Sequence, residues 1–301
     1  MAAVRIGFLG YGEVGQRFAA DLRAADAQRE LATFDLLLHR AADGDALRRH
    51  ASTQRVALMA DAAALAEQAT LIFSAVTADQ TLAAARSLAA RDLTHAVIVD
   101  LNSAAPQTKI ECAALVAAAG GQYVEAAVMT SVPPHGIRVP MLLGGTYATE
   151  AEKLLRGLGF VAETVSADLG VASAIKLCRS VIIKGLESLV VESFTAARRL
   201  GVERQVLASL QETYPQFDWE KQGDYLFSRV IQHGKRRAEE MRASAQMIDA
   251  TGVGGTMAGA IAQRQDAVAT AHAAEAFADP KETKAWRERA DELLAAPQRA
   301  K

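Results

Sequence analysis

Three glycines near the start of the chain constrain its fold more than any other feature. An apolar run from Val4 leads into G-Y-G-E-V-G, and a helix-compatible stretch follows. In a dinucleotide-binding unit Gly10 permits a tight strand-to-helix turn, Gly12 lets the backbone approach a pyrophosphate, and Gly15 lets the helix pack on the strand. Because N–H groups at a helix N-terminus attract phosphates, we predict a cofactor-binding turn rather than an ordinary glycine-rich turn. Its residues are Gly10, Tyr11, Gly12, Glu13, Val14 and Gly15.

The end of the second strand in such a unit bears on the choice between NAD and NADP, because it lies beside the adenosine ribose. The sequence F-D-L-L-L at 34–38 predicts that strand, and His39 and Arg40 follow it. A guanidinium suits a 2′-phosphate, whereas a carboxylate there would repel one. We therefore predict NADP, with His39 and Arg40 as cofactor ligands. The alternatives are a solvated Arg40 and a ribose held by Asp43.

Length and composition predict a two-domain enzyme. The chain has 301 residues, about twice the usual domain size, and 50% of them are hydrophobic. Strands alternate with helices up to about residue 168, whereas helical periods run from Val171 through Ala250 and resume beyond Val253. We expect an α/β Rossmann domain with a mostly parallel sheet over 1–168, followed by an all-α substrate and dimerisation domain over 169–301. Further strands are expected at 71–76, 96–101, 123–128 and 140–143.

Charge and cysteine content exclude several classes of partner. The formal net charge is −2, which gives no general attraction to nucleic acid or to an anionic membrane. Cys112 and Cys178 are too few for a disulfide framework or a cysteine zinc site. Neither a secretory leader nor a membrane-spanning helix is expected. The prediction is a cytoplasmic protein without a bound metal that acts on small molecules.

Ligands of open α/β sheets bind beyond the carboxyl ends of the strands, so three segments there are candidates. Small residues after the strand near 71–76 leave room for a cofactor, and an amide and a hydroxyl end the next strand. That amide and hydroxyl can instead cap the following helix. The expected cofactor contacts are Ala75, Val76, Thr77 and Asn102. The expected substrate contacts are Asn102, Ser103, Thr130 and Ser131. Thr130 and Ser131 precede a Pro-Pro turn, and the backbone N–H groups of their own segment suit a carboxylate.

Two charged stripes mark the helical half, the first within residues 176–187 and the second within residues 233–240. The spacing of the first, by four, four and three residues, places its members on one helix face that meets either solvent or a polar cleft. Spacing alone favours solvent for the first stripe, and a salt-bridged exposed face for the second. The first stripe is Lys176, Ser180, Lys184 and Glu187, with Arg179 beside it, and the second is His233, Arg236, Arg237 and Glu240.

The order of these segments resembles the β-hydroxyacid dehydrogenases related to 6-phosphogluconate dehydrogenase over nearly the whole chain. That family has the glycine fingerprint, a D-x-S-T or G-N-S segment, a D-x-P-V-S-G-G segment with a later G-G, and G-x-G-x-x-x-K-x-x-N. Here D-L-N-S occupies 100–103, E-A-A-V-M-T-S occupies 125–131 before G-G at 144–145, and G-V-A-S-A-I-K occupies 170–176. The K-L-C-R-S-V-I-I-K-G-L-E-S-L and H-G-K-R-R-A-E-E-M segments resemble a subgroup whose C-terminal domain is labelled domain of unknown function 1932.

The resemblance implies an NADP-dependent oxidoreductase that transfers a hydride between the nicotinamide and a small hydroxy acid, a 3-hydroxy acid first, or its keto form. Lys176 would be the general acid/base, with a pKa lowered in a closed cleft and lowered further by Arg179. Arg179 stands where the family has asparagine, and M-T-S replaces S-G-G, so the pocket differs from the family's. An imine reductase and a catalytically idle NADP-binding sensor are the alternatives.

Related enzymes are dimers whose helical domains pack together, so the resemblance also implies a homodimer through the helical domain. It gives the second charged stripe two possible roles, in an acidic substrate's pocket or at the subunit interface. The substrate ligands expected from this half are Arg179, Ser180, His233, Arg236 and Arg237.

Overall fold

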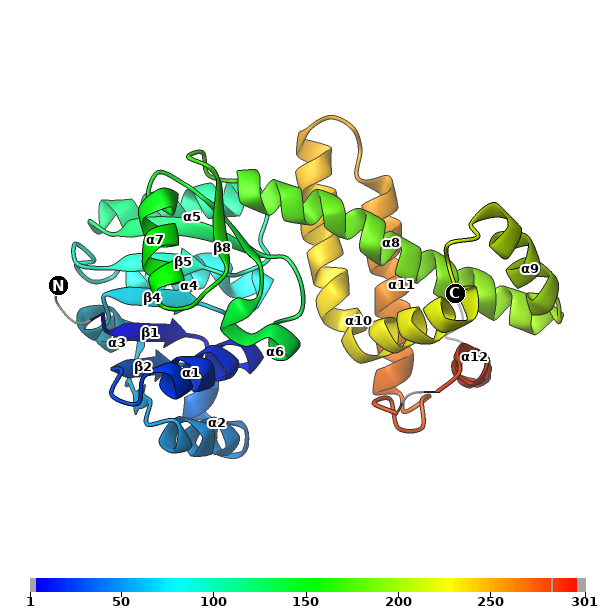
Figure 1. Cartoon of the computed structure of the whole chain (residues 1–301), viewed down its shortest axis with the longest axis horizontal. Helices are drawn as coiled ribbons and strands as arrows, with labels where there is room; N and C mark the ends of the chain where they lie inside the picture. Colours follow the sequence, from blue (N-terminus) through cyan, green and yellow to red (C-terminus); the bar gives the residue numbers. More distant parts are fainter. Residues whose placement is uncertain (1–3, 283, 297–301) are drawn as a thin grey trace. The chain divides into compact units, whose positions relative to one another are not determined.

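The computed structural model describes residues 4–282 and 284–296, without the side chains of 41–43. The chain divides into two compact units, Met1–Lys176 and Leu177–Lys301 (Figure 1). Each unit is described by itself below. The division falls inside one long helix, α8 (Val171–Leu200).

An eight-stranded sheet forms the centre of the first unit in the described part of the chain, in the order β3-β2-β1-β4-β5-β6-β7-β8. All neighbours are parallel except β6 and β7, which are antiparallel. The predicted mostly parallel sheet is therefore confirmed. The strands are β1 (Ile6–Leu9), β2 (Leu31–Phe34), β3 (Ala57–Leu58), β4 (Leu71–Ser74), β5 (Val97–Asp100), β6 (Gln122–Val128), β7 (Met141–Gly144) and β8 (Ala162–Ser166).

Helices cover both faces of this sheet, because successive strand residues point to opposite faces and both sets are apolar. Phe8 and Phe73 pack with α1 and α7 on one face, while Ile72 packs with α4 and α5 on the other. Figure 1 shows α1 and α7 in front of the sheet and α4 and α5 behind it. The helices are α1 (Glu13–Ala25), α2 (Ala41–Thr53), α3 (Ala62–Gln68), α4 (Thr81–Leu88), α5 (Pro106–Ala118), α6 (Val132–His135) and α7 (Ala148–Gly157), with short 3₁₀ helices at Leu36–His39, Ala78–Gln80 and Gly136–Arg138.

The second strand begins and ends earlier than the sequence predicted. It ends at Phe34, and the residues expected to continue it form the 3₁₀ helix Leu36–His39. Asp35 stops the strand, since its Oδ1 accepts a hydrogen bond of 2.8 Å from the N–H of Leu37 and caps that helix. The leucines at 36–38 suggested a buried strand, but Leu36 is exposed. The prediction of a strand over 34–38 was therefore wrong in position.

The second unit is helical in its described part, as predicted. It contains most of α8 together with α9 (Glu203–Thr213), α10 (Trp219–Ala250), α11 (Thr256–Ala273) and α12 (Trp286–Ala295). The core includes Phe194, Phe227 and Trp286, and the rings of both phenylalanines contact that of Trp286. No described helix is both long and apolar enough to cross a membrane.

Candidate active site

The glycine turn has the geometry that a dinucleotide needs. Gly10 has φ +90°, and a Cβ there would lie 2.4 Å from the carbonyl oxygen of Ala75, so only glycine fits. Gly12 begins α1, and a Cβ there would meet nothing within 4 Å. At Gly15 a Cβ would lie 2.7 Å from the carbonyl oxygen of Gly10. These are the tight turn, the open approach and the close packing expected of the three positions, so the chain fits a pyrophosphate here.

The remaining residues of this turn contribute mainly through the backbone. No described side chain caps the N-terminus of α1, which leaves that end available to an anion. The Tyr11 ring is fully buried, and its hydroxyl lies 3.0 Å from Nδ1 of His50. Burial raises the pKa of Tyr11 well above its ordinary value and lowers that of His50. Glu13 is exposed and Val14 is half-buried.

An acidic residue follows β2 where the sequence analysis expected His39 and Arg40. Asp35 comes directly after the strand, and its Oδ2 accepts a hydrogen bond of 2.7 Å from the N–H of Tyr11. Arg40 is exposed at the start of α2, and the ring centroid of His39 lies 5.7 Å from that of Phe34. The side chain of Asp43, the alternative ribose ligand, lies outside the described residues. Asp35 was missed because it was assigned to the middle of a strand.

Asn102 ties together the ends of two neighbouring strands. Its Oδ1 accepts a hydrogen bond of 2.7 Å from the N–H of Val76, and its Nδ2 donates to the Ser74 hydroxyl at 3.0 Å. Neither Asn102 nor Ser103 caps α5, whose N-cap is Ala105, so the alternative of a helix cap was wrong. Of the other predicted cofactor contacts, Ala75 and Val76 are half-buried and Thr77 is exposed.

A buried polar network lies beneath this strand end. The Asp100 carboxylate is 2.9 Å from the Lys109 ammonium and accepts a hydrogen bond of 2.5 Å from the Tyr123 hydroxyl. Asp100 Oδ1 also accepts from the N–H of Asn102 at 2.9 Å. Burial, then Asp100, raises the pKa of Tyr123, and burial raises that of Cys112 to about 11. The sequence offered one signal for this network, because Lys109 shares the buried face of α5 with Cys112, Ala113 and Val116.

Lys176 and Ser103, predicted as catalyst and substrate ligand, lie together. The lysine Nζ donates to the serine Oγ at 2.6 Å, and both residues are half-buried. Ser103 follows β5, while Lys176 lies in the second turn of α8, so strand end and helix meet here. The arrangement holds an amine beside a hydroxyl at the edge of the sheet where ligands of this architecture bind.

Glu125, which the sequence analysis did not select, fixes the start of α8. Its fully buried carboxylate accepts hydrogen bonds from the N–H groups of Gly170 and Ala172, at 2.7 and 3.1 Å, and from the Ser173 hydroxyl at 2.5 Å. A Cβ at Gly144 would lie 2.5 Å from this carboxylate, which explains the glycine at the end of β7. The sequence signal for this role of Glu125 was an acidic residue inside an apolar strand, followed by the G-G pair at 144–145.

Thr130 and Ser131 follow β6, which runs parallel to β5, so they share the carboxyl edge with Ser103. Thr130 is exposed and Ser131 is half-buried before the single turn of α6. In the second unit Arg179 is exposed and Ser180 is buried.

The first charged stripe does not face solvent, so that expectation was wrong for its members in the second unit. Ser180 and Lys184 both donate to Oε1 of Glu240, at 2.5 and 2.8 Å, and Glu187 pairs with Arg237. These partners lie on α10, which packs against this face of α8. The exposed side chains of α8 include the apolar Ile182, Ile183 and Leu189.

The second stripe is only partly exposed. Arg237 is buried in its ion pair with Glu187, whereas Arg236 is exposed. His233 is half-buried, and its Nε2 lies 3.0 Å from Nη1 of Arg229. Burial, then Arg229, Arg236 and Arg237, lowers the pKa of His233 to about 4. The prediction of a salt-bridged exposed face was therefore wrong for Arg237 and Glu240.

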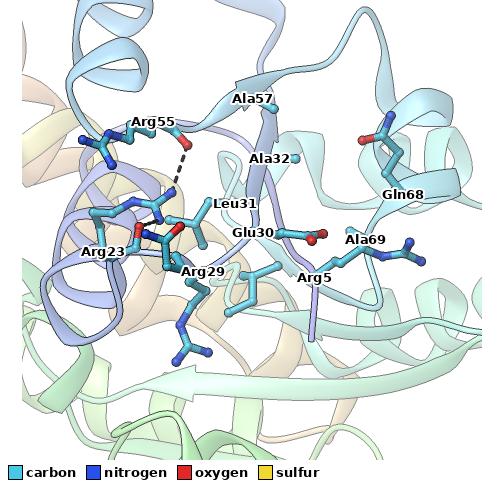
Figure 2. Close-up of a pocket in the computed structure, with 13 residues that line it drawn as sticks. Arg5, Arg23, Arg29, Glu30, Leu31, Ala32, Arg55, Ala57, Gln68 and Ala69 are labelled. Carbon is cyan, nitrogen blue, oxygen red and sulfur yellow. Dashed lines mark hydrogen bonds between the residues drawn. The ribbon is translucent and has the colours of Figure 1, made fainter. Parts of the chain in front are cut away.

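A cavity of about 380 Å³ lies at the opposite edge of the sheet, beside the amino ends of β1 and β2 (Figure 2). Arg23 lies in it and donates to the carbonyl oxygens of Gln54, Ala27 and Arg55 at 2.7 to 2.9 Å, so it joins two loops. Figure 2 shows the side chains of Arg5 and Arg55 pointing in different directions. This cavity therefore presents no convergent set of charges. No three potential metal-ligating side chains gather among the described residues.

Solved structures with the same fold extend over nearly the whole chain. A conserved hypothetical protein from Sinorhizobium meliloti is 38% identical, with 96% of this chain and 95% of that chain covered and a TM-score of 0.75. A conserved protein of unknown function, described as structurally similar to 3-hydroxyacid dehydrogenases, is 30% identical, with 91% and 100% covered and a TM-score of 0.68. Mycobacterium tuberculosis 3-hydroxyisobutyrate dehydrogenase shares the fold at 17% identity, with 97% and 100% covered and a TM-score of 0.67.

Two family models match the chain. Residues 197–268 match a domain of unknown function, DUF1932, and residues 5–176 match the NAD binding domain of 6-phosphogluconate dehydrogenase. The predicted resemblance, the Rossmann domain and the assignment to NAD(P)-dependent dehydrogenases are thereby confirmed at the level of the family. The chain belongs to the dehydrogenase family that carries the NAD binding domain of 6-phosphogluconate dehydrogenase.

Proposed function

We propose that this protein is an oxidoreductase that transfers a hydride between a nicotinamide cofactor and a small hydroxy acid, a 3-hydroxy acid first, or its keto form. The hydrogen bond of 2.6 Å between Lys176 and Ser103 carries the proposal. A chain of contacts links this pair to the glycine turn, since Gly10 lies against Ala75 and the next residue, Val76, bonds to Asn102. Gly10 and Ser103 follow parallel strands at the same carboxyl edge of the sheet, which supports the proposal.

Lys176 is the proposed general acid/base. When bound, the nicotinamide accepts or donates the hydride. In oxidation the neutral Lys176 amine takes the proton from the substrate hydroxyl as that hydroxyl becomes a carbonyl, and in reduction the ammonium returns it. Ser103 orients the amine through their hydrogen bond. Glu125 contributes by capping the helix that carries Lys176.

The proposed carboxylate site uses Thr130 and Ser131, whose N–H groups and hydroxyls suit an anion at the end of β6. Arg179, three residues after Lys176, is the proposed ligand of a second anionic group. Asn102 is proposed to shape the cofactor site rather than to bind substrate directly, because both ends of its amide already bond to protein groups.

Two residues point to different cofactors. Arg40 supports NADP, as the sequence predicted, whereas Asp35 at the end of β2 supports NAD because its carboxylate would repel a 2′-phosphate. Fluorescence titration with NADPH and NADH separates them. If the enzyme uses NADP, the Arg40→Asp variant should bind NADPH about tenfold or more weakly and should bind NADH with little change. An NAD enzyme instead gains NADPH affinity in Asp35→Ala and is insensitive to Arg40→Asp.

Activity is tested with a panel of 3-hydroxy acids, 2-hydroxy acids, their keto forms and imines. Lys176→Ala should abolish turnover while leaving coenzyme affinity unchanged, and the exposed Lys153→Ala on α7 serves as the matched control. Near-normal turnover of Lys176→Ala contradicts the proposed acid/base. Turnover of imines alone favours an imine reductase, and tight coenzyme binding without turnover favours the idle sensor.

A homodimer through the helical domain and a cytoplasmic location complete the proposal. Exposed apolar side chains on α8, with Ile182 72% and Leu189 61% exposed, support the dimer, because a protein seldom leaves such a row in water. Sedimentation of the wild type and of Ile182→Glu tests it. A monomeric wild type contradicts it.

A further inference from the structure

The segment 129–140, which connects β6 to β7, is bound by two side chains of α1. Arg17 and Asp21 form an ion pair on this helix, with Arg17 Nε 3.0 Å from Asp21 Oδ1. Arg17 Nη1 also donates to the carbonyl oxygen of Pro133 at 2.9 Å. Asp21 Oδ2 accepts a hydrogen bond of 2.9 Å from the N–H of Ile137. Figure 1 shows α6, which lies in this segment, beside α1.

The path of the backbone at Gly136 is fitted to that ion pair. Gly136 is buried and has φ +57°, a conformation that residues with a side chain rarely adopt. A Cβ there would overlap Oδ2 of Asp21 and would lie 2.8 Å from Nε of Arg17. The backbone of the segment therefore passes directly against the two side chains, and glycine is needed where it does so.

The helix that holds this segment also begins at the coenzyme turn. Gly12 is the N-cap of α1, and Arg17 and Asp21 follow in the second and third turns of the helix. The segment that they bind begins with Thr130 and Ser131, the proposed carboxylate ligands, directly before α6. One regular element thus carries the coenzyme turn at its start and fixes the proposed acid-binding segment farther along.

We propose that Arg17 and Asp21 are positioning residues that hold Thr130 and Ser131 in the arrangement that binds the carboxylate of the substrate. The inference rests on the proposed function, because it concerns the acid of that reaction. Backbone N–H groups bind a carboxylate only when they converge on it, and a segment that must first be ordered binds more weakly. The pair therefore acts on the affinity for the acid, while hydride and proton transfer are left to other groups.

The steady-state kinetics of Asp21→Ala test this role, because the variant loses the acceptor for the Ile137 N–H and the partner of Arg17. With the acid of the panel that the wild type turns over fastest, KM should rise about fivefold or more, while kcat and coenzyme affinity change less than about twofold. Arg17→Met should raise KM in the same direction. A purely structural role predicts a different pattern, since a loss of folded protein lowers the apparent kcat without raising KM.

Glu152→Ala on α7 is the matched control. Glu152 also forms an ion pair with a residue four positions later, Arg156, and its Oε2 accepts a hydrogen bond of 2.7 Å from the N–H of Thr164. It therefore holds the backbone of β8 in the way that Asp21 holds the segment 129–140, but β8 carries none of the proposed ligands. The KM of this control should stay within about twofold of the wild-type value.

Limited digestion with trypsin separates the hold on the segment from the chemistry, because it needs neither substrate nor coenzyme. Arg138 is exposed, and cleavage after it on the native full chain, mapped by mass spectrometry, requires the segment to open. This cleavage should be about fivefold or more faster in Asp21→Ala than in Glu152→Ala.

Two results overturn the inference while leaving the proposed function intact. One is cleavage after Arg138 that is no faster in Asp21→Ala than in the control. The other is an active Asp21→Ala enzyme whose KM equals that of Glu152→Ala. A wild type that turns over no acid of the panel contradicts the proposed function itself, and the role of Arg17 and Asp21 in acid binding is then withdrawn with it.

Discussion

Two buried carboxylates, Glu125 in the first unit and Glu187 in the second, are stabilised by different means, although the first unit also holds the buried pair of Asp100 and Lys109. In the first unit Glu125 accepts from two backbone N–H groups and one hydroxyl at the start of α8. In the second, Glu187 and Glu240 pair with side chains, Arg237 on the facing α10 and Lys184 on α8. The first arrangement depends on the path of the backbone, and the second on which side chains two helices present to each other.

This difference teaches what each region can do. Backbone donors cannot change rotamer, so Glu125 holds the start of α8 firmly and with it the helix turn that carries Lys176. Buried side-chain pairs add little net stability over well-packed apolar residues, although breaking one is costly. In the first unit Glu125 therefore positions a site, while in the second the pair of Glu187 and Arg237 aligns two helices.

The largest expected effect is in the first unit. Lys109→Ala leaves Asp100 buried without its cation and should lower the free energy of unfolding by about 3–5 kcal/mol. Urea denaturation measures the change. Arg91→Ala, which breaks an exposed pair with Glu67, is the control and should cost no more than about 1 kcal/mol. A loss for Lys109→Ala as small as the control's would remove Asp100 and Lys109 from the structural framework.

The side-chain pair of the second unit should behave differently when both partners are replaced. Arg237→Met alone leaves Glu187 buried and uncompensated, which should cost about 3 kcal/mol. The double variant with Glu187→Leu should recover to within about 1 kcal/mol of the wild type, since an apolar pair fills similar space. Urea denaturation of the single and double variants provides the comparison. A double variant as unstable as the single one would contradict the view that this pair is replaceable.

The same contrast explains how much the sequence predicted. The glycine turn was recognised because only glycine tolerates the backbone at Gly10, and Lys176 with Ser103 because the resemblance carried both. Helical spacing correctly placed Ser180 and Lys184 on one face, but it says nothing about which helix covers that face, so the burial was missed.

The start of the chain shows a second limit. The leucines at 36–38 match a strand in composition, yet Asp35 bonds to the N–H of Leu37 and ends the strand before them. A local side-chain bond of this kind competes with the sheet and leaves little trace in apolar patterning. The same error hid Asp35 from the cofactor site, and Glu125 was missed because its partners lie 45 or more residues away.

Two glycine variants separate positioning by the backbone from binding. Gly144→Ala places a Cβ 2.5 Å from Oε1 of Glu125 and should cost about 1–3 kcal/mol, with a loss of activity. Gly12→Ala meets nothing within 4 Å and should change stability by no more than about 0.5 kcal/mol, yet it should weaken coenzyme binding. Urea denaturation and coenzyme titration of both variants test this. Equal losses of stability would show that the turn is packed and leaves no room for a pyrophosphate.

The smallest expected effect concerns His233 in the second unit. Its pKa is about 4 in the folded protein and 6.5 when unperturbed, so the unfolded chain binds more protons between these values. Stability should therefore fall as the pH drops from 6.5 to 4, and His233→Gln should flatten part of that slope. Urea denaturation of both proteins across this range gives the difference directly, because the contribution of His50, whose pKa is also lowered, is common to both. Parallel slopes would mean that burial and the guanidinium groups of α10 do not lower the pKa of His233 in the folded protein.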